Sequence, residues 1–329
     1  DPNEKKMTKP EITPIITNRD VASPFLVEVQ ESAVKPIEPV FLDYQKDMSQ
    51  LKAKSDIPVL YKQNVANDLF QLIYVFDMGN NHDKALGTAF DYLEYLGTSD
   101  MTPEELKSEF YRLACTFYVS PGNERTYVVL SGLNENMPAA VQLFEKLLAD
   151  AQVNKEAYTN MTSDILKARS DAKLNQGQNF SRLMSFAMYG PKSPATNLLT
   201  EAELTNMNPQ ELVDRIHNQN SYKHRILYYG PSSSKDLLAT INQYHQVPAA
   251  LKDIPAGNEY AYLETPVTKV LVAPYDAKQI YMAQISNLDK KYDPAIQPIR
   301  ALYDEYFGGG MNSIVFQEMR ETRGLAYSA

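Results

Sequence analysis

Residues 306–329 read YFGGGMNSIVFQEMRETRGLAYSA, and this string carries the strongest structural signal in the chain. A helical pattern over residues 293–310 precedes it and ends on Gly308, Gly309 and Gly310. These glycines predict a helix end and a sharp turn, because glycine accepts positive φ angles and lets another backbone approach closely. The string lacks the spacing and the lysine of a phosphate-binding P-loop. An amphipathic charged segment follows, and the apolar GLAYSA predicts the start of a strand.

The residues before this string show a strand and helix pattern that starts twice. Alternating stretches at 57–64 and 69–79, joined by the turn-prone VAND, predict one β-hairpin, and 115–133 predicts another. Helical spacing covers six further stretches: 82–97, 98–114, 137–151, 155–174, 177–190 and 208–219. A strand at 224–233 and a helix at 234–245 complete the set, and strand patterns at 267–276 and 279–287 begin it again. The pattern predicts an α+β fold with an internal repeat whose second copy is truncated.

Four segments follow from this pattern. We predict a proline-rich linker from an upstream half at 1–56, a first domain at 57–248, a second linker at 249–264, and the N-terminal part of a second domain at 265–329. The chain begins with Asp1 and stops within a predicted strand, so we interpret it as a fragment of a longer protein.

Composition excludes several classes of function. The 329 residues carry a formal net charge of −9, and no cluster of Lys and Arg is visible, which disfavours nucleic-acid binding. No apolar run approaches the roughly 18 residues of a membrane span. The single cysteine, Cys115, excludes an internal disulfide and is expected in the core. None of the four histidines stands four residues from another, so a helical histidine pair for a metal is absent.

The order of elements and the string at 307–328 resemble the insulinase/pitrilysin family of zinc metallopeptidases, the inverted zincins. The resemblance covers residues 30–329 and is to the C-terminal, non-catalytic half of a long bacterial member. It implies tandem metallopeptidase-type α/β sandwich domains, each a sheet covered by helices. Members of the family hold zinc with a His-x-x-Glu-His motif in the first half, and two halves close around a peptide.

The resemblance also locates where a zinc motif would lie in the first domain. The frame AFDYLEYLGT matches the family frame around its motif, but Asp91 and Tyr95 replace both histidines and only Glu94 survives. The best match to the third family ligand is Asp164. Zinc sites of this kind need two imidazoles on one helix face, with the glutamate as base on the bound water. We therefore expect no metal at this site, and a hydrogen-bonded or solvated helix carboxylate at Glu94.

Two residues of the C-terminal string match family positions that contact substrate. The resemblance implies that Arg320 and Tyr327 reach the active site of the other half, hydrogen-bond substrate carbonyls and stabilise the oxyanion. The alternative from the residues alone is that Arg320 pairs with Glu318 or Glu321 on a solvated helix face, and that Tyr327 is a core strand aromatic. Arg323 is adjacent and is the weaker candidate.

The resemblance implies the non-catalytic half of a zinc metalloendopeptidase, which walls a peptide-binding chamber and contributes contacts to an upstream active site. The fragment itself would hold no cofactor, and the full-length enzyme would hold zinc. Its partners would be a peptide or unfolded protein substrate and the upstream catalytic half. The alternative is a non-enzymatic peptide-binding or scaffold protein with a degenerate peptidase fold. Export of long Gram-negative members favours the periplasm over the cytoplasm, although no signal is visible in the polar start of the chain.

Overall fold

The computed structural model describes residues 22–287 and 292–328, so part of the predicted first linker and the chain end at Ala329 lie outside the described residues. The chain divides into two units, Asp1–Asp47 and Met48–Ala329. Helix α1, Pro24–Glu31, is the one regular element in the described part of the first unit. The Ser23 side chain caps it, and none of its residues is buried.

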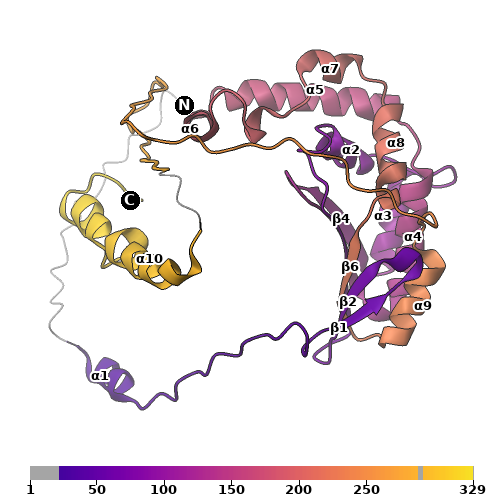
Figure 1. Ribbon diagram of the computed structural model, residues 1–329, viewed down its shortest axis with the longest axis horizontal. Coiled ribbons are helices and arrows are strands. Elements are labelled where there is room, and N and C mark those ends of the chain that lie inside the picture. Colours follow the sequence, from indigo (N-terminus) through magenta and orange to yellow (C-terminus); the bar gives the residue numbers. More distant parts are fainter. Residues whose placement is uncertain (1–21, 288–291, 329) are drawn as a thin grey trace, which may run out of the picture. The chain divides into compact units, whose positions relative to one another are not determined.

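The second unit is built on a six-stranded sheet with the order β1-β2-β6-β3-β5-β4 (Figure 1). The strands are β1 Ser49–Lys52, β2 Pro58–Gln63, β3 Leu69–Phe76, β4 Cys115–Pro121, β5 Thr126–Leu133 and β6 Arg225–Gly230. β2 and β6 run parallel, and the other neighbouring pairs run antiparallel. This mixed sheet with its helices confirms the predicted α+β class.

The predicted hairpin at 57–79 is wrong, because β6 lies between its two strands. The backbone N–H of Asn64 donates to the carbonyl of Gly230 at 2.8 Å, so the short connection passes the end of β6 instead of closing on itself. Stacked rings of Tyr61 and Tyr228, 5.7 Å apart, join β2 to the inserted strand. The connection between β2 and β3 has the length of a hairpin loop, although the two strands do not pair with each other. The second predicted hairpin, β4 with β5, is confirmed.

Strand β1 was also missed, since residues 1–56 were predicted to be irregular. It pairs with β2 from Ser49↔Tyr61 to Lys52↔Pro58. β1 has four residues, and only Leu51 is partly buried, so the sequence shows no alternation long enough to detect. The sheet therefore begins within the stretch that was predicted as linker.

Helices cover the sheet and extend beyond it. They are α2 Leu86–Leu93, α3 Pro103–Arg112, α4 Met137–Asp150, α5 Lys155–Ala172, α6 Gln176–Tyr189, α7 Glu201–Asn206, α8 Gln210–Asn218 and α9 Ser234–Tyr244. The predicted start of α3 is confirmed: Thr102 and Glu105 form a capping box, and Pro103 begins the helix. The six-residue α7 was not predicted.

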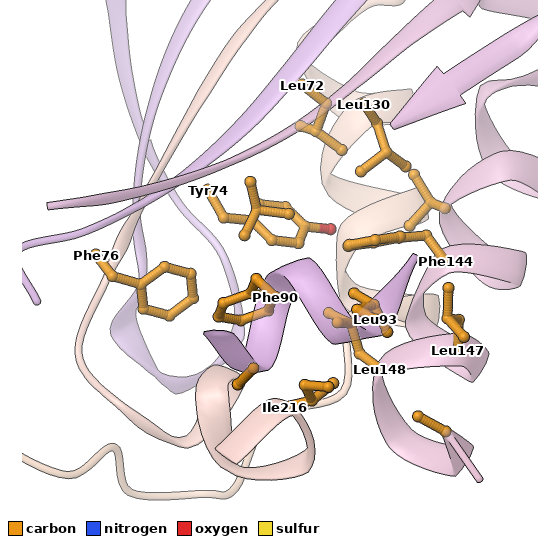
Figure 2. Close-up of a cluster of buried hydrophobic side chains, with 14 of the residues drawn as sticks. Leu72, Tyr74, Phe76, Phe90, Leu93, Leu130, Phe144, Leu147, Leu148 and Ile216 are labelled. Carbon is orange, nitrogen blue, oxygen red and sulfur yellow. The ribbon is translucent and has the colours of Figure 1, made fainter. Parts of the chain in front are cut away.

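The hydrophobic core lies between the sheet and the helices. In β3, Phe70, Leu72 and Tyr74 are buried and alternate with more exposed residues, whereas at the end of the strand both Val75 and Phe76 are buried. Figure 2 shows Tyr74 and Phe76 of β3 facing Phe90 of α2 and Phe144 of α4. Cys115 is buried in the same core, and burial raises the pKa of its thiol.

The strands predicted at 267–276 and 279–287 do not form in the described part of the chain. Their apolar side chains, Val270 and Ile280 among them, are exposed, and none of the described strands pairs with them. A strand needs a neighbour for its backbone groups, and the alternating pattern cannot supply one. Thr265 and Asn287 instead hydrogen-bond to each other, which brings the ends of this segment together.

The C-terminal segment is helical, as predicted over 293–310. Helix α10, Gln297–Asp304, continues as a π-helical turn Glu305–Gly309, and a second π-helical turn spans Phe316–Thr322. The glycines do end the first helix, because Gly310 is extended at φ −154°. However, positive φ occurs in this segment at Gly324, with φ 58°, and not at Gly308, Gly309 or Gly310. The strand predicted from Leu325 is not formed over the described residues 325–328.

Candidate functional site

The residues at the motif positions lie at the C-terminal end of α2. Asp91 stands in the last turn, Glu94 caps the helix end, and Tyr95 follows it; all three are exposed. The residues between them anchor the helix. Leu93 is buried, and the buried Tyr92 donates its hydroxyl hydrogen to the Asn154 carbonyl at 2.6 Å and accepts from the Asn154 N–H at 2.8 Å. This arrangement fixes the end of α2 against the start of α5.

Two cavities flank this helix end. The first, about 350 Å³, is lined by three of the predicted positions, Glu94, Tyr95 and Asp164, so the structure brings these side chains around one space. The second, about 320 Å³, is lined by Asp91 and by apolar side chains along β4. Glu94 and Lys107 line both cavities. The four positions taken from the family frame therefore surround the same part of the domain.

These side chains do not fit a catalytic zinc ion. Zinc sites are built from imidazole, thiolate and carboxylate donors in a tight tetrahedron, and here the phenol of Tyr95 stands where one imidazole would be. Throughout 22–287 and 292–328, no three His, Cys, Asp or Glu side chains gather closely enough to hold a metal ion. The donor set at Asp91, Glu94, Tyr95 and Asp164 therefore does not match the ligand set of a catalytic zinc site.

The end of α2 is electrostatically unfavourable. Although Asp91 is exposed as a residue, partial desolvation of its carboxyl by the surrounding protein raises its pKa, and the nearby charge of Glu94 adds to this effect. Carboxylates near a helix C-terminus are also repelled by the helix dipole. Among the ion pairs of the described residues, none involves Asp91 or Glu94. Neither carboxylate is therefore held in an ion pair within the described residues, although Lys107 lines the same cavities.

Arg320 and Tyr327 lie together in the C-terminal segment. The Arg320 guanidinium carbon is 4.5 Å from the centre of the Tyr327 ring and 4.7 Å from that of Phe316. Arg320 also approaches Glu321 at 3.7 Å, whereas Glu318 pairs with Arg323. Tyr327 is 84% exposed, so the alternative that it is a core strand aromatic is wrong.

A buried polar network was missed by the sequence reasoning. His245 Nδ1 lies 2.7 Å from Glu145 Oε1, and His245 Nε2 lies 2.9 Å from His224 Nε2. The side-chain N–H of Asn220 donates to the other Glu145 oxygen. Glu145 and His245 are no more than 1% exposed. The hydrogen-bonded pairs of this network are 21 to 100 positions apart in the chain, so no local spacing could have revealed it.

Burial, followed by the neighbouring His245, lowers the pKa of His224 to about 4. Neutral His224 donates from Nδ1 to the Tyr222 carbonyl, at 2.7 Å, and accepts at Nε2 from His245. His245 then faces the Glu145 carboxyl with its other nitrogen. The network joins α4 to the segments flanking β6 and α9.

Comparisons with known proteins identify others that are similar in sequence or fold. A protein of Rickettsia felis described as an uncharacterized zinc protease is 20% identical over 263 residues, covering 76% of this chain; the chain spans only 60% of that relative. The peptidase M16 inactive domain from Pseudomonas fluorescens superposes with a TM-score of 0.63 at 17% identity, over 86% of this chain and 69% of that one. The periplasmic protease PqqL from Escherichia coli gives 0.58 at 15% identity, over 79% of this chain and 28% of its own.

No protein-family model matches the chain. In the part of the chain that the structure describes, every helix is too short or too polar to cross a membrane. The mixed sheet, the order of its helices and these similarities together show that the chain has the fold of a peptidase M16 inactive domain and resembles the insulinase/pitrilysin family of zinc metallopeptidases.

Proposed function

We propose that this chain is the non-catalytic half of a zinc metalloendopeptidase and forms one wall of its peptide-binding chamber. The observation that carries the proposal is the end of α2. In this proposal it corresponds to the family's motif position in the first domain, and its side chains are Asp91, Glu94 and Tyr95, which do not match a zinc ligand set. The similarity to a peptidase M16 inactive domain supports the same reading.

In this proposal the metal and the general base belong to a catalytic half encoded upstream of Asp1. The chain spans less than a third of PqqL, which leaves room in such a protein for that half. We further propose a first domain that begins with β1 at Ser49, earlier than the limit of 57 predicted from the sequence, and ends at 248. The linker 249–264 and a second domain at 265–329 follow in this proposal. A periplasmic location is proposed as well, supported by the description of PqqL as periplasmic.

Arg320 and Tyr327 would provide hydrogen-bond donors to the reacting peptide. A guanidinium and a phenol hydroxyl stabilise negative charge that develops on a carbonyl oxygen, most strongly where water is excluded. The 4.5 Å contact of Arg320 with the Tyr327 ring supports their action as a unit, because it holds the two donors side by side.

The test is hydrolysis of a quenched fluorescent peptide by the polypeptide in which these 329 residues occur together with the proposed catalytic half. We expect cleavage that a metal chelator abolishes and that this chain alone does not perform. Absence of cleavage across a broad set of peptides would contradict the proposal and favour the non-enzymatic peptide-binding or scaffold protein.

A further inference from the structure

Three hydrogen bonds follow one another through the buried network, and we call them the histidine series. His224 Nδ1 lies 2.7 Å from the Tyr222 carbonyl oxygen, and His224 Nε2 lies 2.9 Å from His245 Nε2. His245 Nδ1 lies 2.7 Å from Glu145 Oε1. Contacts of this length between such atoms need one hydrogen between the two heavy atoms. The histidine series therefore holds three hydrogens, one in each contact.

A further proton has no free position in this series. The backbone carbonyl at one end can only accept, so His224 Nδ1 keeps its hydrogen. A fourth hydrogen must then lie in one of the two contacts of His245, where two N–H groups, or an N–H and an O–H, would face each other. The second oxygen of Glu145 already accepts from the side chain of Asn220 and from the backbone N–H of Gln246. Proton uptake therefore breaks a hydrogen bond within this network and leaves a net positive charge in the core.

The hydrogen bonds at risk hold the start of the segment that leaves the first domain. His245 directly follows α9, and Gln246 N–H bonds to Glu145 at 3.0 Å. Farther along, Lys252 N–H donates to the Ser221 carbonyl, at 2.8 Å. A cavity of about 300 Å³ lies between α4, residues 217–221 and residues 246–248. The segment therefore has space on one side into which it can move once its first attachment is lost.

The other titratable groups around the histidine series keep their charge state in mild acid. The ring of Tyr74 in β3 lies 4.5 Å from that of His245, and burial, followed by the charge of Glu145, raises the pKa of Tyr74 well above its ordinary value. His217 borders the cavity, and its Nε2 contacts the Ala151 carbonyl outside the series. The charged side chains next to His224 in the sequence have ion pairs of their own, Lys223 with Asp253 and Arg225 with Asp77.

We propose that the histidine series is an acid-sensitive latch: uptake of one proton releases His245 and residues 246–254 from α4 and so loosens the connection that follows the first domain. In the released state both imidazoles meet water, where each can bind a proton without losing a partner. The pKa of His224 is about 4 in the folded protein and 6.5 in a free side chain, so acid favours release. The latch needs neither a catalytic half nor a substrate, so it can be measured on this chain and is independent of the proposed peptidase role.

Amide hydrogen exchange, followed by NMR on the deuterated and 15N-labelled chain, measures this release. The reporters are the backbone N–H groups of Gln246 and Lys252, and the N–H of Ile73 within β3 reports global unfolding. Rates are corrected for the direct effect of pH on exchange. We expect both reporters to exchange faster than Ile73 and to lose protection at least about tenfold between pH 7 and pH 5. The side-chain 15N shifts should show a hydrogen on Nδ1 of His224 at pH 7.

His224→Gln removes the titrating group, and His217→Gln is the matched control, because His217 borders the same cavity but lies outside the histidine series. We expect the reporters to lose less than about threefold of their protection in His224→Gln and to follow the parent in His217→Gln. Exchange of Gln246 and Lys252 in step with Ile73, protection that does not depend on pH in the parent, or parent-like pH dependence in His224→Gln would each overturn the latch. The parent's exchange and 15N shifts do not depend on the folding of a variant, and an Nδ1 of His224 without hydrogen would overturn it as well.

Discussion

Arg320 holds its guanidinium between two aromatic rings, those of Phe316 and Tyr327. If it stabilises the transition state, replacement by alanine in the complete enzyme should lower kcat by about 10²- to 10³-fold. Zinc content should stay the same, because this role does not include holding the metal, and KM should change less than kcat if the contact strengthens in the transition state. Steady-state kinetics and metal analysis of Arg320→Ala check this. Arg323→Ala is the control, since Arg323 pairs with Glu318 and should leave kcat unchanged. Unaltered turnover by Arg320→Ala would exclude the role.

His224 should make the stability of the domain depend on pH. Its folded pKa of about 4 lies below the value of 6.5 for a free histidine, so the unfolded state binds more protons between these values. Stability is therefore complete above pH 6.5 and falls as pH drops toward 4, by on the order of 3 kcal/mol. Near His224 lie Tyr74 and Phe76 of β3, His245 after α9 and, through His245, Glu145 of α4.

Urea unfolding at several pH values measures this slope. His224→Gln keeps a polar side chain at the position and removes the titrating group. We expect the variant to be less stable at pH 7.5 but to lose less stability than the parent between pH 6.5 and 4.5. Parallel curves for parent and variant would show that other groups, and not His224, govern acid sensitivity.

At the scale of elements, β4 offers a direct test of the direction of its backbone groups. Tyr118 N–H faces β5 and Val119 N–H faces outward, according to the alternation of the ladder. Tyr118→Pro should therefore cost at least about 2 kcal/mol more than Val119→Pro in urea unfolding, because proline removes an internal hydrogen bond at one position and an edge donor at the other. Equal losses, or a larger loss at Val119, would reverse the assignment of the outward edge.

Sequence patterns within a few residues predicted where helices and strands occur, but they did not predict which strands are neighbours in the sheet. The capping box at Thr102 and Glu105 is local chemistry, so the start of α3 could be predicted from four residues. The partner of β2 could not, because β6 comes more than 160 positions later and inserts beside it. The motif positions at Asp91, Glu94 and Tyr95 were located through a family frame. Glu94 and Tyr95 line a cavity together with Asp164, and this depends on how α2 and α5 pack, which the sequence does not show. Roles for these residues, and for Arg320 and Tyr327, stay predictions.

At the scale of the whole molecule, the hydrophobic core of the second unit is formed by one continuous part of the sequence. The buried side chains of the core lie between Ala53 and Ile241, and the partly buried ones packed against them end at Ile254. Later residues attach to the surface: Tyr262 stacks on Tyr189, and Leu263 N–H bonds to Met188 of α6, a helix with no buried residue. The repeat was predicted from alternating residues at 267–287, which the described structure leaves without strands.

We expect residues 48–258 to fold without the remainder of the chain. Contacts beyond Asn258 join exposed surfaces, so their loss should change the free energy of unfolding by no more than about 1 kcal/mol. Urea unfolding of residues 48–258 and of the whole chain gives the comparison. A shorter piece, 48–244, is the control: it lacks His245, whose buried ring contacts Glu145, and should lose cooperative unfolding because a buried carboxylate is left without its partner. If 48–258 also unfolded without cooperativity, the predicted domain limit near residue 248 would be wrong, and the segment beyond it would be part of the folding unit.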